Sequence, residues 1–459
     1  MQADALKKIL ALARAGATSR AWEAFKAAGF DRAVADANAL TLKGRLLKDQ
    51  ARNAPSHLRP ALFALAGEAY EHAAKPGSET YPLINAAAMS LHAGESERSA
   101  ELAARVLHLI ESGQEQGETP YWGEATRAEA LLLLGRIEDA KASLAHAVSL
   151  APQAWEDHAA TLRQFALILS ELGGNDDWLD RFRPAPAMHF NGILGITSDD
   201  KAASNAIAAE VRLIAPGFAY GALAAGADIR AAEAAVLVGA ELHIVLPSDP
   251  HDFRKGSVEP LGGDWAQRFD SLLEIADTLT ICDKAESTSA AGVALAELYA
   301  MGLAIERASQ LQAQAVALRI EPAERPILGD PWLHSGYPIR HVAVSASTAS
   351  VIPQLPAGAL TFDIATDDAI EKFASLGEAV AALRNAGSVR MAIDCRLGET
   401  VHVQALLPHS AHGMVAASRS AALGLLASGL ASRIETIGEL AFPDGPVELC
   451  LAKLSEPPG

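Results

Sequence analysis

The sequence is poor in cysteine, in aromatic residues and in positive charge. Its three cysteines, Cys282, Cys395 and Cys450, lie far apart and form no C-x-x-C pair. A disulfide framework and a structural zinc site are therefore not expected, and the cysteines are expected to be small buried side chains. The net charge is −18, and the chain lacks the clustered lysines and arginines that binding to a nucleic acid or to an anionic membrane surface would require. We expect neither as a partner.

Long apolar runs are also missing. The sequence contains no stretch of about 18 uncharged apolar residues, which a membrane-spanning helix would need. The apolar residues near the N-terminus fall at helical spacing, and Lys7, Lys8 and Arg14 interrupt them. This pattern predicts an amphipathic first helix rather than a signal peptide. We expect a cytoplasmic protein without a membrane segment.

Common catalytic motifs are absent as well. The sequence has no G-x-S-x-G, Walker A or H-E-x-x-H motif. His409 and His412 lie close together without carboxylate neighbours, so we expect surface residues rather than a metal site. Glu286 and Glu297 could each act as a general base beside a ligand, although a solvated charge on a helix is the simpler interpretation of both. We expect no set of catalytic residues.

The first feature that the sequence does contain is a run of helices over residues 1–178. The segment 121–152 fits the tetratricopeptide pattern of about 34 residues. Its matching positions are Ala128, Leu131, Gly135, Ala140, Leu144, Ala147 and Pro152. Weaker copies cover 84–106 and 58–75. Small residues at this spacing let two helices approach closely, and each hairpin leaves an apolar face that a neighbour must cover. The pattern predicts an α-solenoid.

A different pattern follows the polar, proline-containing segment 175–186. Short β-type runs alternate with amphipathic stretches, which predicts a mostly parallel, Rossmann-like sheet over residues 187–325. Its strands are expected at 188–193, 218–223, 242–246, 278–281 and 315–320, and its helices at 202–214, 227–239, 263–276 and 289–311. The pattern of residues 335–455 predicts a third, small α/β domain. Its strands are expected at 342–345, 359–362, 389–394, 400–406, 434–437 and 447–451, and its helices at 367–385 and 413–428. The expected fold class is multidomain, α followed by α/β.

The stretch from Gly217 to Asp228 is the strongest candidate for a ligand site. Gly221 and Gly226 lie between a predicted strand and a predicted helix. Glycine there permits close approach of the backbone, and the start of a helix offers N–H groups to an anion. Asp228 could cap the helix or contact a ligand. The stretch is not G-x-G-x-x-G, so a standard dinucleotide site is not indicated.

Polar stretches follow the next two predicted strands. SDPHDFRKGSVEPLGGDWAQRFD (248–270) is predicted to be a long polar loop at the carboxyl end of a strand, where open α/β sheets bind ligands. It contains Asp252 and Ser257. The alternative is a solvated connection, and its Trp265 and Phe269 are expected to pack under the sheet. CDKAESTSAAG (282–292), which contains Glu286, could complete the same crevice.

Several strings resemble known families. ALTLKGRLLKDQAR (39–52), YPLINAAAMSLHAG (81–94), YWGEATRAEALLLLG (121–135) and DHAATLRQF (157–165) resemble bacterial tetratricopeptide proteins of the TRAFs-binding-domain type. AAGAD (224–228), AELHIVLP (240–247), DFRKGSV (252–258) and AMGLAIERA (300–308) are similar to the SLOG group of Rossmann-like ligand binders.

The second resemblance implies a nucleotide-derived ligand at the glycine turn. The expected ligand-binding residues are Gly192, Gly221, Gly226, Asp228, Asp252, Ser257 and Glu286. Two departures from the family argue against an enzyme. Ile193 stands where a histidine usually follows the glycine of the first strand, and the P-G-G-x-G-T-x-x-E motif of the related phosphoribohydrolases is absent.

The last part of the chain resembles a shortened class III nucleotide cyclase domain, through SVRMAIDCRLGETV (388–401) and ETIGELAFPDGPVELCLAKL (435–454). A working cyclase needs two metal-binding carboxylates and an Asn/Arg pair. Asp363 and Asp394 are the candidate carboxylates. The helix that carries the Asn/Arg pair corresponds to 415–419, where Arg419 is present and the Asn is not. We expect a degenerate, catalytically inactive domain without a bound metal.

Two kinds of function fit these features. The first is a non-enzymatic sensor or adaptor in bacterial signalling, whose repeats bind a protein partner through their concave face while the Rossmann-like domain binds a nucleotide-derived ligand. The alternative is a nucleotide or nucleoside hydrolase, with Glu286 or Glu297 assisting at the crevice. A residual cyclase is a third possibility. The sequence names neither the ligand nor a cofactor.

Overall fold

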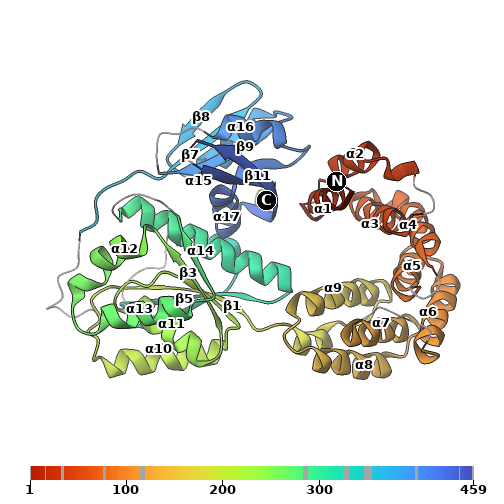
Figure 1. The fold of residues 1–459 in the computed structure, drawn as a ribbon, viewed down its shortest axis with the longest axis horizontal. Coiled ribbons are helices and arrows are strands. Elements are labelled where there is room, and N and C mark those ends of the chain that lie inside the picture. The colour runs from red at the N-terminus through yellow and green to blue at the C-terminus, as the bar shows by residue number, and fades with distance from the viewer. Residues whose placement is uncertain are drawn as a thin grey trace. The chain divides into compact units, whose positions relative to one another are not determined.

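A computed structural model describes residues 2–15, 17–32, 36–75, 79–113, 119–282, 288–323, 330–345, 354–397, 402–443 and 445–456. The chain divides into two compact units, Met1–Pro184 and Ala185–Gly459 (Figure 1). We call them the helical unit and the α/β unit. Within the described ranges, no helix combines the length and the apolar character needed to cross a membrane.

The helical unit consists of successive helices that pack in pairs. They are α1 Gln2–Ala15, α2 Thr18–Ala27, α3 Ala37–Asn53, α4 Arg59–Ala73, α5 Thr80–His92, α6 Ser96–Glu111, α7 Pro120–Leu133, α8 Ile137–Leu150 and α9 Trp155–Glu171, with the 3-10 helices η1 Phe30–Arg32, η2 Ser56–Leu58 and η3 Asp177–Phe182. Helix α3 packs on α4, α5 on α6, and α7 on α8. Figure 1 shows the helices following one another along an arc. The expected helical first part is confirmed.

The turns inside two of these hairpins have the same hydrogen bonds. After α5, Glu95 N donates to Ser90 O and Gly94 N to Leu91 O, both at 2.9 Å. After α7, the N–H groups of Arg136 and Gly135 make the equivalent bonds, at 2.9 and 3.0 Å. Both glycines have positive φ, 84° and 72°, which L side chains rarely adopt. This is the Schellman ending, and it explains why α5 and α7 end just before these glycines.

Small residues allow the helix pairs to approach closely. Ala128, Ala140 and Ala147, the small positions of the 121–152 pattern, are fully buried. A Cβ atom on Gly44 of α3 would lie 2.8 Å from the Tyr70 ring of α4. Tyr70 itself is 2 % exposed, so the contact between α3 and α4 depends on glycine at position 44.

The α/β unit begins with a parallel sheet of six strands. They are β1 Ala187–Gly192, β2 Phe218–Gly221, β3 Glu241–Leu246, β4 Thr278–Ile281, β5 Ala315–Glu321 and β6 Ile339–Ala343, in the order β4-β3-β2-β1-β5-β6. Every pairing in this sheet is parallel. The central strand β1 places Met188 beside Ala219 of β2 and Val316 of β5. The strand predicted at 342–345 corresponds to β6 and belongs to this sheet.

Helices connect these strands on both faces of the sheet. They are α10 Lys201–Ile214, α11 Ala227–Leu237, α12 Pro250–Ser257, α13 Trp265–Ile275 and α14 Ala290–Leu311, with the 3-10 helices η4 Glu259–Leu261 and η5 Pro331–Ser335. Figure 1 shows α14 on one face and α10, α11 and α13 on the other. The chain leaves β1 toward β2 through α10 and reaches the other side of β1 through α14. The carboxyl ends of β1 and β5 therefore form the topological switch point of the sheet, where α/β proteins bind ligands.

A second, mixed sheet of six strands completes the α/β unit. Its strands are β7 Thr361–Thr366, β8 Ile370–Phe373, β9 Met391–Arg396, β10 Val415–Ser418, β11 Ala431–Phe442 and β12 Gly445–Leu454, in the order β11-β12-β10-β9-β7-β8. Its helices are α15 Leu376–Ala386, α16 Val403–Leu406, η6 Leu407–His409 and α17 Arg419–Ala427. Strands β9 and β10 are parallel and the other pairings are antiparallel.

Two helices expected in this region begin later than predicted, as α15 and α17, and one expected strand is wrong. The predicted helix 367–385 begins instead with strand β8, which pairs with β7 through a tight turn in which Ala369 O accepts from Thr366 N at 2.9 Å. The predicted helix 413–428 begins with strand β10, because its small apolar residues fill a fully buried position between β9 and β12. The predicted strand 400–406 contains helix α16, and residues 398–401 lie outside the described ranges. Short apolar runs do not distinguish a buried strand from a helix.

The two sheets of the α/β unit are joined by a seam between α14 and α17. A Cβ atom on Gly302 of α14 would lie 2.5 Å from Leu423 O of α17. Arg419, at the start of α17, forms a bidentate ion pair with Glu306 of α14. Its Nη1 donates to Glu306 Oε1 at 2.8 Å, and its Nη2 donates to Glu306 Oε2. Both side chains of the pair are largely buried. Glycine at 302 lets the helices approach, and the ion pair fixes their register.

Candidate functional site

Asp228 lies where the end of β1 meets the start of α11. Gly226 occupies the N-cap position of α11, with φ of 121°, and Asp228 follows in the first turn. The expectation that Asp228 caps the helix is therefore wrong. Its side chain points back across the turn, where Oδ1 accepts from Gly192 N at 3.0 Å and Oδ2 from Ala224 N at 3.4 Å. One carboxyl group thus ties strand β1 to the glycine turn.

The protonation of Asp228 is set mainly by its burial. The residue is 8 % exposed, and burial raises its pKa to about 8. The two backbone N–H groups and the distant Arg319 oppose the rise, whereas the charge of Glu297 adds to it. At neutral pH the carboxyl is therefore mostly protonated. Carboxyl groups whose pKa is strongly shifted occur often at functional sites.

The three glycines of the expected site are in contact with protein atoms. A Cβ atom on Gly192 would lie 2.3 Å from Ala227 Cβ, and one on Gly221 would lie 2.5 Å from the Phe190 ring. A Cβ atom on Gly226 would lie 2.8 Å from Ile193 O. Close packing between β1, β2 and α11 is thus sufficient to require all three glycines, and their contact with a ligand stays a prediction.

Two N–H groups at the glycine turn already have protein acceptors. Ala227 N donates to Ile193 O at 3.2 Å, and Ala225 N donates to Ser257 O at 3.1 Å. Ser257, an expected site residue, is buried and adjoins the turn through its backbone. Asp252 is half-buried in α12, and no described hydrogen bond or ion pair joins it to the turn. Glu286 lies outside the described residues.

The stretch 248–263 differs from the expected loop. Residues Pro250–Ser257 form helix α12, with Pro250 in the first turn and Asp249 at the N-cap, where its side chain accepts from His251 N at 2.9 Å. The polar composition concealed this helix because its only buried apolar side chain is Phe253. Trp265 and Phe269 are fully buried, as expected.

A buried polar layer lies between β1, β5 and α14. Asn191 Nδ2 donates to Glu297 Oε1 at 2.8 Å. Deeper in the sheet, Arg319 donates to Asp330 Oδ2 at 2.5 Å and to His189 Nδ1 at 2.9 Å. Because an arginine can only donate, the accepting nitrogen of His189 carries no proton. This layer was not predicted from the sequence. The signal that could have shown it is the presence of the polar residues His189, Asn191 and Arg319 inside otherwise apolar strands.

The His189 ring is shielded on its other side by Trp332. The two rings stack with centroids 5.9 Å apart and an interplanar angle of 20°. Burial, together with the charge of Arg319, lowers the pKa of His189 well below its usual value. His189 is therefore neutral near pH 7, and its contacts with Arg319 and Trp332 support strand β1.

In the second sheet, Asp363 of β7 and Asp394 of β9 are cross-strand neighbours. Both are buried, and His402 Nδ1 lies 3.7 Å from Asp394 Oδ2. No group of three or more His, Cys, Asp or Glu residues suited to a metal ion occurs within the described ranges. The segment compared with the cyclase Asn/Arg helix is strand β10, and Arg419 is engaged by Glu306.

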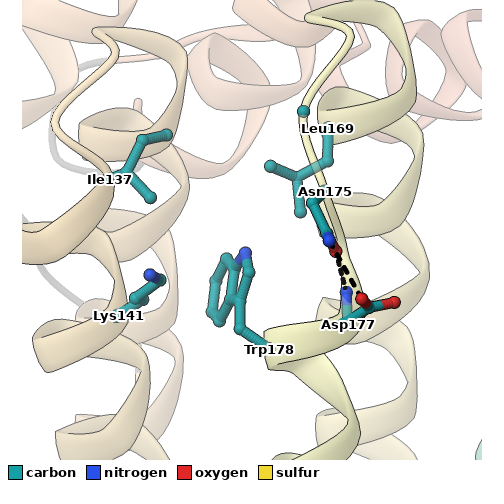
Figure 2. Close-up of a pocket in the computed structure, with 7 residues that line it drawn as sticks. Ile137, Lys141, Leu169, Asn175, Asp177 and Trp178 are labelled. Atoms are coloured by element: carbon teal, nitrogen blue, oxygen red, sulfur yellow. Dashed lines mark hydrogen bonds between the residues drawn. The ribbon is translucent and has the colours of Figure 1, made fainter.

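The helical unit contains a pocket of about 380 Å³ between α8, α9 and η3. Figure 2 shows the Trp178 ring standing between Ile137 and Lys141 on one side and Leu169 and Asn175 on the other. Lys141 Nζ lies 5.5 Å from the centre of the Trp178 ring, and Asn175 is held by hydrogen bonds to Asp177 of 2.7 and 2.9 Å.

Residues 4–90 match the family described as Tetratricopeptide Repeats-Sensor (TPR-S). The match extends from α1 into α5, and together with the helical hairpins it fits a tetratricopeptide repeat protein. The segment 121–152, on which the sequence argument rested most, lies outside the matched range but forms the α7–α8 hairpin of the same array. Curated proteins and solved structures give no match to the chain.

Proposed function

We propose that this chain is a sensor or adaptor. Its helical hairpins bind a protein partner through their concave face, and its parallel sheet binds a small nucleotide-derived ligand at the switch point. The TPR-S match supports the first half of this proposal, because tetratricopeptide repeats generally mediate protein interactions. The second half rests on Asp228.

The main support for a ligand site is that the Asp228 carboxyl is buried where its charged form is unfavourable. Burial raises its pKa to about 8, although a serine or an asparagine could accept the Gly192 N–H bond without this cost. The group lies at the start of a helix and at the carboxyl end of β1, where a polar ligand would meet it. A protonated carboxyl can donate to an acceptor atom of a ligand, which a charged carboxylate cannot.

Thermal unfolding against a panel of nucleotides and nucleotide-derived second messengers tests the ligand site. A ligand at about 100 times its Kd stabilises the protein by about 2.7 kcal/mol, which raises Tm by a few degrees. The shift should be lost in Asp228→Ala, which removes the group that would donate to the ligand, and kept in Asp270→Ala, which removes one exposed carboxylate from α13. A flat response to the whole panel would refute the ligand site, and turnover of any panel member would refute a non-enzymatic role.

The proposed binding of a protein partner by the helical unit is tested by co-purification. Full-length protein and residues 185–459 are compared for the proteins that they retain from the same cells. Retention of every partner by residues 185–459 would refute a binding role for the helical unit, whatever the result of the nucleotide panel.

A further inference from the structure

Polar side chains from four helices of the helical unit converge on one place. Helix α3 contributes a stripe at helical spacing, α5 contributes Tyr81, and α7 and α9 contribute Glu129 and Gln164. We call Arg45, Lys48, Asp49, Tyr81, Glu129 and Gln164 the Lys48–Glu129 cluster. Gln164 Nε2 donates to Glu129 Oε1 at 3.1 Å, and the charge of Lys48 acts on Glu129. Helices α5, α7 and α9 contact one another, so the array itself assembles the cluster.

The hydrogen bonds of this cluster are incomplete. Arg45 Nε and Asp49 Oδ2 are 3.9 Å apart, too far for a hydrogen bond. Both atoms are buried, and among the described residues neither has another hydrogen-bond partner. Lys48 and Glu129 form no ion pair with each other among the described residues. A buried donor and a buried acceptor without hydrogen-bond partners are both costly, so the side chains of Arg45 and Asp49 leave hydrogen-bonding capacity unused.

Helix α3 carries more basic than acidic residues around the cluster, although the chain carries a net charge of −18. Burial lowers the pKa of Lys48, Asp49 partly opposes this, and Arg45 and Arg52 reinforce it by repulsion. Burial raises the pKa of Glu129 to about 7 against the effects of Gln164 and Lys48. Around the cluster, helix α3 thus carries the basic residues Arg45, Lys48 and Arg52 against the acidic Asp49. The Glu129 carboxyl is only partly ionised at neutral pH.

The cluster is accessible from outside. Tyr81 is 52 % exposed, and the Arg45 side chain is 39 % exposed. Lys48 and Glu129 are half-buried. Side chains that lose much of their hydration and still keep accessible surface can exchange the remaining water for a ligand.

We propose that the Lys48–Glu129 cluster binds an acidic segment of a partner protein, with Arg45 and Lys48 donating to an aspartate or glutamate carboxylate. This inference rests on the proposed partner-binding role of the hairpins and specifies the chemistry of that partner. A singly charged carboxylate fits better than a phosphate, because Asp49 and Glu129 repel a second negative charge at this distance. Tyr81 and Gln164 offer hydrogen bonds to the adjacent peptide backbone.

The test is a selection of random peptides displayed on phage against the full-length protein. Peptides that bind are synthesised with a fluorescent label, and their affinities are measured by anisotropy. We expect the selected sequences to share an Asp or Glu, and we expect binding to fall when that residue is changed to Asn or Gln. Selection of peptides without a shared acidic residue, or of no peptide, would overturn the inference.

Matched variants locate the binding site. Lys48→Gln should weaken the selected peptide at least about tenfold, because it removes one partner of a largely desolvated charge pair. Lys43→Gln removes the same charge from an exposed position on the same helix and should leave the affinity unchanged. Glu129→Gln keeps the acceptor for Gln164, removes the opposing carboxylate, and should tighten binding. Helical circular dichroism confirms that each variant is folded.

Equal affinities of Lys48→Gln and Lys43→Gln would overturn the inference, because the peptide would then bind elsewhere. Competition by inorganic phosphate that is stronger than competition by acetate would also overturn it, since the cluster would then prefer phosphate groups. A peptide that binds the helical unit away from the cluster leaves the proposed partner role intact. Loss of the partner role is detected separately, by the co-purification with residues 185–459.

Discussion

Asp228 makes the α/β unit less stable as the pH rises. Its pKa is about 8 in the folded protein and about 3.9 in an unfolded chain. Between these values the folded state keeps a proton that the unfolded state has released, so the free energy of unfolding falls with increasing pH. The carboxyl therefore opposes folding most strongly above pH 8.

Asp228→Asn removes this pH dependence. The amide cannot ionise and its oxygen can still accept from Gly192 N, so the variant should unfold at a higher temperature than the parent. The gain should be small at about pH 5 and reach a few degrees at about pH 8. Thermal unfolding followed by circular dichroism across this range measures it. A gain that is the same at both pH values would show that Asp228 is ionised in the folded protein.

His189 has the opposite effect at acid pH. Its pKa in the folded protein lies well below its ordinary value of 6.5. As the pH falls below about 6.5, the unfolded state takes up a proton that the folded state refuses, so stability decreases. His189→Gln lacks this titration and should lose stability less steeply on acidification, although the loss of ring packing lowers its stability at neutral pH. Urea unfolding at several pH values checks the two slopes, and parallel slopes would contradict the assignment.

At the scale of elements, the long amphipathic helices and buried strands of the parallel sheet could be predicted from the sequence. The predicted helices 202–214 and 289–311 correspond to α10 and α14 within one residue. Helix α12 could not be predicted in this way, because Phe253 and Ser257 are its only buried side chains and no periodicity results. Strand β10 was missed because Val415-Ala-Ala-Ser is equally suited to a helix until its neighbours β9 and β12 are known.

The candidate site was predictable in part for a related reason. Glycine and aspartate in the turn at 221–228 signalled a special backbone, which led to Asp228. The contacts that define its environment come from Gly192 and Glu297, which are distant in sequence. Spacing along the chain gives no information on such contacts.

The α14–α17 seam gives a prediction at the same scale. Gly302→Ala should destabilise the α/β unit by about 1–3 kcal/mol, since the new methyl group would meet the α17 backbone. Gly377→Ala is the matched control: Gly377 is also helical, in α15, and a Cβ atom there meets nothing within 4 Å. The control should be neutral or slightly stabilising, because alanine is the better helix former. Chemical denaturation compares the two variants, and equal stabilities would mean that α14 and α17 are not in close contact at Gly302.

At the scale of the whole molecule, the α/β unit should fold without the helical unit. Residues 185–459 contain both sheets and the seam that joins them. We expect this fragment to unfold in one cooperative transition. Residues 185–345, which keep the parallel sheet but expose the α17-facing side of α14, should be less stable and more prone to aggregate. Separate transitions for the two sheets in residues 185–459 would contradict the role of the seam.

The stacking of Trp332 on His189 has an optical consequence. Trp265 and Trp332 are the tryptophans of the α/β unit, and both are fully buried. A protonated imidazole quenches the fluorescence of an indole ring that it touches, whereas a neutral imidazole does so weakly. While His189 stays neutral, Trp332 should emit brightly at short wavelength. Opening of this layer to water removes the burial that lowers the pKa of His189. It should therefore dim the Trp332 emission at mildly acid pH before the spectrum shifts to the red.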